Sequence, residues 1–363
     1  MLLKAIQDYF HRCGIKCSED NILIAPSTFQ IVGDIFDLTK PAGKVLLPTP
    51  SFGYFVEQCE QRSIQTALLP TDESTNWKIT PEALEKALTI NKPSIFLFTN
   101  PVNPTGTVYT KQEVEGIAAV LKRHNVLIIA DEIFKDIILN FDKKHYSLAA
   151  VEGIEDKVVT LNGVGKSRGL PSMFVSFCTA PRNIEDALRK EHAVSQQRTQ
   201  QLVAAEALTD NPENRAYLEE TAARYRDNIS LIKERLVRLN GALGKKFGEQ
   251  KEEYVRPVVK NPDATNVYLL NFHGLRGKMI NGKPLATGLD VAKFLQKEVS
   301  VAMVPYEGFL MDARAMTLRL ILSRPAEELR QGFSTITKAC EKLVEPPHPQ
   351  SPTASPADPS STR

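Results

Sequence analysis

The sequence contains little cysteine, a single tryptophan and almost no net charge. Of its 363 residues, five are cysteine and one is tryptophan, and 45 basic side chains nearly balance 43 acidic ones. Because a net charge of +2 creates no strong field, we do not expect the chain to bind nucleic acid or acidic membranes. The cysteines are odd in number and lack metal-site spacing, so we expect no metal and free thiols in a reducing cytoplasm.

Long hydrophobic runs are also missing. No apolar stretch approaches the roughly 18 residues that a membrane span needs. The first eight residues, Met-Leu-Leu-Lys-Ala-Ile-Gln-Asp, predict the start of an amphipathic helix and not a signal peptide. A content of 42% hydrophobic and 24% charged residues is typical of a soluble globular protein. The length suffices for one large core or two unequal ones.

Residues 1–180 alternate between short apolar runs and helical patterns. Helix starts are marked at Ser27-Thr28, at Thr80 with a following proline, and at a capping box from Thr110 to Glu113. Near-continuous apolar strands between helices predict an α/β fold, with a mostly parallel sheet sandwiched by helices. The predicted strands are 22–24, 45–47, 94–98, 126–130 and 158–161, and a helix is predicted at 52–61.

The second half has a different pattern. Residues 182–240 favour helix with a break at 210–213, and strands are predicted at 267–270, 301–304 and 318–322 among helices at 288–297 and 325–343. We therefore expect a smaller α+β domain at the C-terminal side. The predicted organisation is a large cofactor-binding domain (1–212), a connecting helix (213–240), a small domain (241–345) and a disordered Pro/Ser/Thr-rich tail (346–363).

Three polar residues each follow an apolar run that predicts a buried strand. Asn103 lies in Asn-Pro-Val-Asn-Pro-Thr-Gly, Asp131 opens Asp-Glu-Ile-Phe, and Lys166 lies in Gly-Val-Gly-Lys-Ser. Ligands of parallel sheets bind outside the carboxyl ends of the strands, where all three should meet. An amide, a carboxylate and an amine together are what a pyridine-aldehyde cofactor needs: a Schiff-base lysine, an acid at the ring nitrogen and a donor at the ring hydroxyl.

Each of these residues also has an ordinary interpretation. A lysine after a strand is usually a solvated surface group, an aspartate there often caps the next helix, and Asn-Pro pairs favour turns. Phe52 is as compatible with a core as with a platform under a planar ring. Arg319, on an apolar strand, needs an anionic partner, which is either a substrate carboxylate or a protein acid.

Two competing motifs fail at specific positions. Gly165-Lys166-Ser167 resembles the end of a phosphate-binding loop, but that loop needs a glycine where Thr160 stands, and Pro171 disfavours the long helix that should follow. Gly163 and Gly165 also begin a dinucleotide pattern, which needs a third glycine where Arg168 stands.

The asparagine loop, the Asp-Glu-x-aromatic segment and the lysine loop, in this order and spacing, resemble class I/II aminotransferases of the fold type I pyridoxal-phosphate group. Segments 44–52, 301–309 and 317–320 resemble further family segments, and the resemblance covers roughly residues 2–344. It implies transfer of an amino group between an L-amino acid and a 2-oxo acid through a Lys166 aldimine. It also implies a homodimer.

The resemblance further implies a role for each site residue. Lys166 would form the aldimine and move the α-proton, Asp131 would pair with the ring nitrogen, and Asn103 would bind the ring hydroxyl beside the substrate. The remaining cofactor and substrate contacts implied are Phe52 stacked on the ring, Ser27 and Thr28 at the phosphate, Phe134 beside the ring, and Arg319 at the substrate α-carboxylate.

The chain departs from the family pattern at several of these positions. Gly163 and Gly165 replace serines, Phe174 replaces a phosphate-binding arginine, and Phe134 replaces a tyrosine that donates to the ring hydroxyl. The resemblance implies that the chain begins inside the family's first large-domain helix, and we therefore expect it to lack the family's N-terminal arm. Losing one charge-assisted contact costs about 1.5–3 kcal/mol. Arg168 and Ser167 are the neighbours that could compensate.

Three functional hypotheses therefore stay open. The first is an aminotransferase. The second is another pyridoxal-phosphate reaction, such as elimination, cyclisation or oxidation, which the phenylalanines at 134 and 174 favour. The third is a catalytically degenerate binding protein that keeps the fold.

Overall fold

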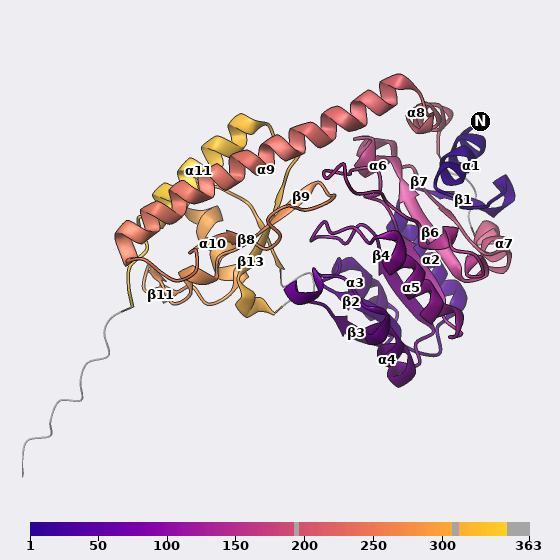
Figure 1. Cartoon of the computed structure of the whole chain (residues 1–363), viewed down its shortest axis with the longest axis horizontal. Helices are drawn as coiled ribbons and strands as arrows, with labels where there is room; N and C mark the ends of the chain where they lie inside the picture. Colours follow the sequence, from indigo (N-terminus) through magenta and orange to yellow (C-terminus); the bar gives the residue numbers. More distant parts are fainter. Residues whose placement is uncertain (192–195, 307–311, 347–363) are drawn as a thin grey trace, which may run out of the picture.

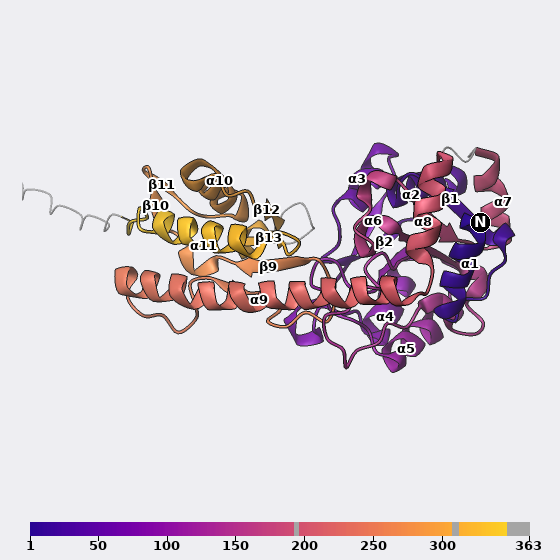
Figure 2. The ribbon, with the colours of Figure 1, turned by 90° about the horizontal axis from the view of Figure 1, so that it is seen from above.

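The chain forms two lobes joined by one long helix. The computed structural model describes residues 1–191, 196–306 and 312–346. Helix α9 (Pro212–Phe247) runs from the N-terminal lobe to the far end of the C-terminal lobe, as Figures 1 and 2 show from two directions. The first core lies in the N-terminal lobe, and α9 contributes side chains to the second.

The N-terminal lobe is built on a seven-stranded sheet with the order β1-β7-β6-β5-β4-β2-β3. The five strands from β6 to β3 are mutually parallel, whereas β7 runs antiparallel to both β1 and β6. This confirms the mostly parallel sheet. The strands are β1 (Ile22–Ala25), β2 (Val45–Thr49), β3 (Thr66–Pro70), β4 (Ile95–Thr99), β5 (Leu127–Asp131), β6 (Val158–Gly163) and β7 (Ser176–Thr179).

Helices cover both faces of this sheet because both faces are apolar. In β4, Phe96 and Phe98 point to one layer of helices, and Ile95 and Leu97 point to the other. One layer contains α1 (Leu2–Arg12), α4 (Pro81–Asn91), α5 (Lys111–Lys122) and α8 (Arg198–Leu208), and the other contains α2 (Thr28–Thr39), α3 (Tyr54–Gln61) and α7 (Arg182–Glu191).

The predicted helix starts are confirmed by their caps. The Ser27 hydroxyl accepts a hydrogen bond from the Gln30 amide at the start of α2, and Thr80 accepts one from the Ala83 amide. Thr110 and Glu113 form the expected capping box. The helix predicted from Phe52 begins two residues later, at Tyr54.

The C-terminal lobe contains a four-stranded antiparallel sheet with the order β12-β13-β9-β8. Its strands are β8 (Arg256–Pro257), β9 (Val267–Asn271), β12 (Val304–Pro305) and β13 (Thr317–Ile321), and β10 (Met279–Ile280) pairs separately with β11 (Lys283–Pro284). Side chains of α9, α10 (Gly288–Val299) and α11 (Ala326–Cys340) pack with the sheet in one core.

Two sequence predictions for this half need correction. The strand predicted at 301–304 is reduced to β12, because the amide of Val301 bonds to the Leu295 carbonyl and completes the end of α10. The long helix continues to Phe247, beyond the predicted end at 240, whereas its predicted break is confirmed by the Asn211 cap. The predicted tail after residue 346 and the family-like residues 307–309 lie outside the described residues.

A loop-to-loop contact fastens the lobes together. The Ala264 amide donates to the Gly106 carbonyl at 2.8 Å, and the buried Asp263 carboxylate accepts from the Val108 amide at 3.2 Å and from the Asn140 side chain at 3.1 Å. Asp263 therefore joins the loop that contains Asn103 and the segment that follows Asp131 to the C-terminal lobe.

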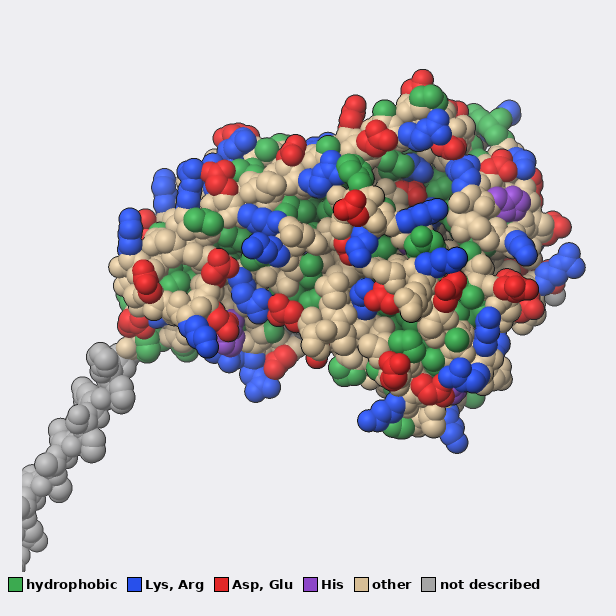
Figure 3. All heavy atoms as spheres, in the orientation of Figure 1, with side chains coloured by type: hydrophobic (Ala, Val, Ile, Leu, Met, Phe, Trp, Pro, Cys, Tyr) green, Lys and Arg blue, Asp and Glu red, His purple; other side chains and the backbone are tan. Residues whose placement is uncertain are grey.

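The surface carries both signs of charge. On the face in Figure 3, basic and acidic side chains are interspersed over both lobes. Within the described ranges, each helix is too short or too polar to cross a lipid bilayer.

We predict that Gly106→Ala destabilises the protein. Gly106 has φ of 76°, and an added Cβ would lie 2.2 Å from the Ala264 carbonyl oxygen. The left-handed conformation alone costs an alanine about 1–2 kcal/mol. The steric overlap of the new Cβ with the Ala264 carbonyl adds to this cost, because it pushes apart the two loops that join the lobes. Urea denaturation monitored by circular dichroism measures the change.

Gly241→Ala is the matched control, since Gly241 lies inside α9 and an added Cβ meets nothing within 4 Å. It should stabilise the helix by about 0.5–1 kcal/mol. Equal stability of the Gly106→Ala variant and the wild type would contradict the close packing of these two loops.

Candidate active site

A cavity of about 360 Å³ lies between the two lobes, at the carboxyl ends of the parallel strands. Residues from both lobes line it, including Asn266, Val267 and Ile321 from the C-terminal lobe. Every site residue selected from the sequence also lines it: Ser27, Thr28, Phe52, Asn103, Asp131, Phe134, Lys166 and Arg319. The structure thus brings together residues that are up to 292 positions apart in the sequence.

Asp131 is the last residue of β5 and is buried, with 8% of its surface exposed. Burial raises the pKa of its carboxyl group to about 6, although the Ile133 amide donates to it at 3.1 Å and the Lys166 charge also favours the ionised form. A buried carboxylate of this kind is stabilised by a cationic partner placed in the cavity.

Lys166 lies on α6 (Val164–Ser167), a helix of one turn that directly follows β6. Its side chain is exposed to the open cavity, but the cavity walls desolvate it and lower its pKa, and the nearby Arg319 lowers the pKa further. Asp131 acts in the opposite direction. The lowered pKa increases the fraction of neutral, nucleophilic amine.

The two asparagines of the 100–106 loop have different surroundings. Asn100 is fully buried and structural, because its amide donates to the Tyr146 carbonyl and accepts from the Tyr109 amide. Asn103 faces the cavity, and its buried side-chain oxygen has no hydrogen-bond partner among the described residues. A buried amide without a partner is unfavourable until a ligand supplies one.

Arg319 reaches the cavity from β13. Desolvation by the surrounding protein lowers its pKa, whereas the buried Tyr306 acts to raise it. Burial in turn raises the pKa of Tyr306 well above its usual value, so the phenol stays neutral. A desolvated guanidinium is well suited to bind a carboxylate through two parallel hydrogen bonds.

An aromatic wall stands near the start of α2. The rings of Phe29 and Phe52 stack with their centroids 5.6 Å apart and an angle of 14° between their planes. Phe134 is buried and belongs both to the cavity wall and to the core of the C-terminal lobe. Phe174 also lines the cavity, with 59% of its surface exposed and φ of 50°.

Neither residue considered as a compensating phosphate ligand is among the described residues that line the cavity. Ser167 is buried. Arg168 forms an ion pair with Asp136 at 3.1 Å, and Asp136 also accepts from the Tyr9 hydroxyl at 2.9 Å and from Lys135 at 2.9 Å. These contacts connect the end of α6 to the segment after Asp131 and to α1. Arg168 therefore helps to hold the segment that contains Lys166 in position.

Several residues of the site were not predicted from the sequence. Ser176 begins β7, a short strand with two polar residues that the apolar-run criterion misses. Asn266 directly precedes β9, and the strand prediction at 267–270 could have drawn attention to it. The other unpredicted lining residues include Phe29, Ile133, Leu170, Val175, Val267 and Ile321.

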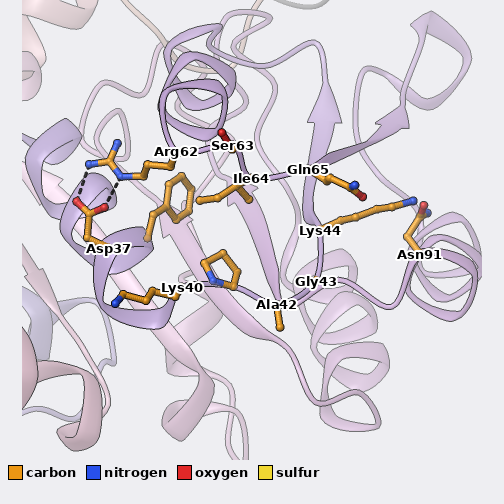
Figure 4. A pocket seen from close by; sticks show the side chains of 12 residues that line it. Asp37, Lys40, Ala42, Gly43, Lys44, Arg62, Ser63, Ile64, Gln65 and Asn91 are labelled. Carbon is orange, nitrogen blue, oxygen red and sulfur yellow. Dashed lines mark hydrogen bonds and ion pairs between the residues drawn. The ribbon is translucent and has the colours of Figure 1, made fainter.

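A larger cavity, of about 780 Å³, lies at the opposite ends of β2 and β3. Figure 4 shows that Arg62 is paired with Asp37 there, while the side chains of Lys40 and Lys44 extend in different directions. The basic groups of this larger cavity do not converge on one point. The buried acid Asp131 and the amine of Lys166 lie in the cavity between the lobes. Within the described residues, no three His, Cys, Asp or Glu side chains cluster as metal ligands would.

The chain matches the family model for aminotransferase class I and II over residues 1–336. It belongs to this family. A likeness in sequence is found with the probable N-acetyl-LL-diaminopimelate aminotransferase of Bacillus subtilis (strain 168), which is 26% identical over 326 residues, covering 88% of this chain and 73% of the relative.

Solved structures of the same fold accompany this match. The aspartate aminotransferase of Rhizobium meliloti superimposes with a TM-score of 0.80 at 22% identity, over 94% of this chain and 82% of the other. A C–S lyase from Staphylococcus hominis gives a TM-score of 0.78 at 19% identity, over 93% and 78%. These confirm the fold type I architecture.

Membership makes this chain an aminotransferase-family enzyme, and the family uses pyridoxal phosphate. The end of the cavity at Asp131, Asn103 and Lys166, called here the ring end, fits the ring of that cofactor. It holds a buried acid, an amide oxygen that bonds to none of the described residues, and a desolvated amine. The end of the cavity at Ser27 and Thr28, where the resemblance implies the phosphate, fits less well and is called here the phosphate end. Lys166 and Arg319 are the only basic residues among the described residues that line the cavity.

We predict that Asp131→Asn stabilises the cofactor-free protein at neutral pH. Burial raises the pKa of Asp131 from 3.8 to about 6, so its contribution to stability is full below the unfolded pKa and is lost as the pH rises through the folded pKa. Two pKa units correspond to about 3 kcal/mol. As the pH rises from about 4 to about 7, the free energy of unfolding of the asparagine variant should therefore increase relative to that of the wild type.

Urea denaturation at several pH values measures this difference, with Asp156→Asn, an exposed aspartate, as the control. A constant difference between Asp131→Asn and wild type across this pH range would show that Asp131 is not penalised by burial.

Proposed function

We propose that the chain is a pyridoxal-phosphate-dependent aminotransferase that exchanges an amino group between an L-amino acid and a 2-oxo acid. The observation that carries the proposal is the pairing of Lys166, an amine with a lowered pKa, with Asp131, a buried acid, in one cavity. When bound, the cofactor supplies an electron sink for negative charge at the substrate α-carbon.

The ring end of the cavity is assigned first. Lys166 provides the amine that binds the cofactor covalently and then carries the proton to and from the substrate α-carbon. Asp131 would hold a proton on the ring nitrogen, Asn103 would hydrogen-bond the ring hydroxyl, and Phe52 would cover one face of the ring. Phe134 packs at the ring edge without donating a hydrogen bond.

The two anionic groups are assigned to opposite lobes. Arg319 binds the substrate α-carboxylate from the C-terminal lobe. The phosphate would be held at the start of α2, where Ser27 caps the helix and the Thr28 amide is available as a donor. Phe174 leaves this end without an arginine.

The partners and setting follow from the family. We propose a homodimer, as is usual for these enzymes, acting on small molecules in the cytoplasm. The five free cysteines support a reducing compartment.

Another pyridoxal-phosphate reaction, such as elimination, is the second candidate. Phe134 and Phe174 support it, because they remove a hydrogen bond and a charge that would otherwise hold the cofactor in one position. Release of a 2-oxo acid with conversion of the cofactor to its amine form indicates transamination, and release of ammonia without that conversion indicates elimination or oxidation. A catalytically degenerate binding protein predicts neither.

We predict that the protein purified with pyridoxal phosphate absorbs visible light in a way that depends on Lys166. Lys166→Ala should abolish the band because Lys166 is the only lysine among the described residues that line the cavity. Lys86→Ala, which changes an exposed lysine of α4, should retain the band. Visible spectra and mass spectrometry after borohydride reduction provide the measurement. A band that persists in Lys166→Ala refutes the assignment.

We also predict that Phe174→Arg tightens the binding of pyridoxal phosphate. A new charge-assisted hydrogen bond contributes about 1.5–3 kcal/mol, which corresponds to roughly 10- to 100-fold in the dissociation constant. Phe174 is exposed, so the longer side chain has room.

Two controls make the result specific for the phosphate. Phe174→Leu removes the ring without adding charge and should leave the affinity near that of the wild type. Pyridoxal, which lacks the phosphate, should bind wild type and Phe174→Arg about equally. An equal gain for pyridoxal would place residue 174 away from the phosphate.

A further inference from the structure

We infer that Glu132 is a positioning residue for the proposed reaction, because its buried side chain holds the loop of Asn103 against the strand that ends at Asp131. The inference rests on the proposed function, in which Asn103 and Asp131 bind two positions on the same cofactor ring. Glu132 itself is not among the residues that line the cavity, so it would act through its neighbours.

Glu132 follows Asp131 directly and is fully buried, with 0% of its surface exposed. Its Oε1 atom accepts a hydrogen bond from the Ser147 hydroxyl at 2.6 Å and another from the Leu148 amide at 3.3 Å. The side chain therefore joins the end of β5 to residues 145–148, which we call the bridging segment.

The bridging segment also binds the start of the Asn103 loop. The His145 Nε2 atom lies 3.1 Å from the Asn100 carbonyl oxygen, and the Asn100 side-chain amide donates to the Tyr146 carbonyl at 3.0 Å. Burial lowers the pKa of His145 to about 3, so its ring is neutral at neutral pH. Because a carbonyl oxygen can only accept, the Nε2 atom carries the hydrogen. The bridging segment thus connects Glu132 to Asn100.

The position of Asn103 depends on its loop, because its side-chain oxygen has no hydrogen-bond partner among the described residues. The loop closes on itself through two hydrogen bonds. The Val102 amide donates to the Thr107 carbonyl at 2.9 Å, and the Gly106 amide donates to the Val102 carbonyl at 2.7 Å. A shift at Asn100 would therefore move Asn103 together with the rest of the loop.

The main chain of Glu132 has separate contacts with the strand that leads to Lys166. The Asn162 side chain donates to the Glu132 carbonyl at 3.1 Å, and the Glu132 amide donates to the Leu161 carbonyl at 3.1 Å. These bonds do not involve the carboxyl group. A change of the Glu132 side chain should therefore displace Asn103 and leave Lys166 in place.

The Glu132 side chain is unfavourable for the fold, which argues against a purely structural role. Its Oε2 atom has no hydrogen-bond partner among the described residues, and the neutral His145 ring lies 3.7 Å away. Burial raises the pKa of Glu132 to about 7 and Asp131 acts in the same direction, whereas Ser147 and Lys135 oppose the shift. Buried groups that are incompletely satisfied are expected where function requires them.

Hydrogen–deuterium exchange of the cofactor-free protein tests the anchor directly. Glu132→Ala removes both hydrogen bonds to the bridging segment, and Ser147→Ala removes the shorter one. We expect the amides of residues 100–106 to exchange at least tenfold faster in Glu132→Ala and at least threefold faster in Ser147→Ala. Unchanged exchange of these amides in Ser147→Ala would overturn the inference, whether or not Glu132→Ala folds.

Thr80→Ala is the matched control for a general loss of stability. It removes the side chain that caps α4 in the same lobe, away from the bridging segment. Its exchange at residues 100–106 should equal that of the wild type. An increase as large as that in Ser147→Ala would show that any weakening of the lobe releases this loop, and would overturn the inference.

A double-mutant cycle tests whether the effect reaches the cofactor through Asn103. Pyridoxal phosphate is titrated into the full chain, and the Lys166-dependent absorbance gives the dissociation constant. Ser147→Ala should weaken binding roughly three- to tenfold and have no further effect in an Asn103→Ala background. A general structural role would weaken both backgrounds equally, and that result would overturn the inference.

Glu132→Gln tests the hydrogen bonds apart from the charge. Glutamine keeps an oxygen that can accept from Ser147 and Leu148 but cannot ionise. It should therefore bind pyridoxal phosphate more tightly than Ser147→Ala does, and close to the wild-type affinity. Binding as weak as that of Ser147→Ala would overturn the inference.

The titration also separates this inference from the proposed function. A wild type that binds pyridoxal phosphate through Lys166 but shows no coupling between Ser147 and Asn103 would overturn this inference alone. A wild type without a Lys166-dependent band would overturn the proposed function, and this inference with it.

Discussion

The site depends on the parallel pairing of β5 with its neighbours β4 and β6. Asp131 ends β5 in register with Thr99 of β4 and Leu161 of β6, so the loops that contain Asn103 and Lys166 leave the sheet on either side of the acid. A shift of one residue in this register would turn Asp131 to the opposite face of the sheet. Because apolar residues are required on both faces of these strands, the cores that hold the two layers of helices also hold the acid in position.

Burial shifts the pKa values of Asp131 and Lys166 in opposite directions, and a single ligand can offset the cost of both shifts. The same exclusion of water raises the pKa of Asp131 and lowers that of Lys166, so each charged form is less favourable than it would be in water. In the proposed function, a ring with a protonated nitrogen would supply Asp131 with a cation, and a carbonyl group would react with the neutral amine of Lys166. The folded protein therefore maintains an arrangement that is unfavourable by itself and favourable with the ligand, as expected for functional sites that depart from optimal stability.

The sequence predicted the parts of this arrangement that depend on local patterns. Apolar runs followed by Asn103, Asp131 and Lys166 located the strand ends, and the caps at Ser27, Thr80 and Thr110 located the helices. The short strand β7, which contains two polar residues, was missed because it is held between β6 and β1, and β1 is distant in the sequence. The role of Arg168 stayed open for a similar reason: nothing local indicates that Arg168 pairs with Asp136, where Tyr9 and Lys135 complete a cluster.

The two anion-binding ends of the proposed site differ in strength, and this difference shapes its function. In the proposed function, the desolvated guanidinium of Arg319 would bind the substrate, whereas the phosphate would be held at the start of α2 beside the apolar Phe174. Contacts at a helix start are worth about 0.3–1 kcal/mol each at exposed positions, less than a charged hydrogen bond. In the proposed function, the cofactor would then be retained mainly through its ring, by Lys166, Asp131 and the aromatic wall. Substitutions at the ring end should consequently affect cofactor binding as strongly as chemistry, a coupling that an arginine at position 174 would relieve.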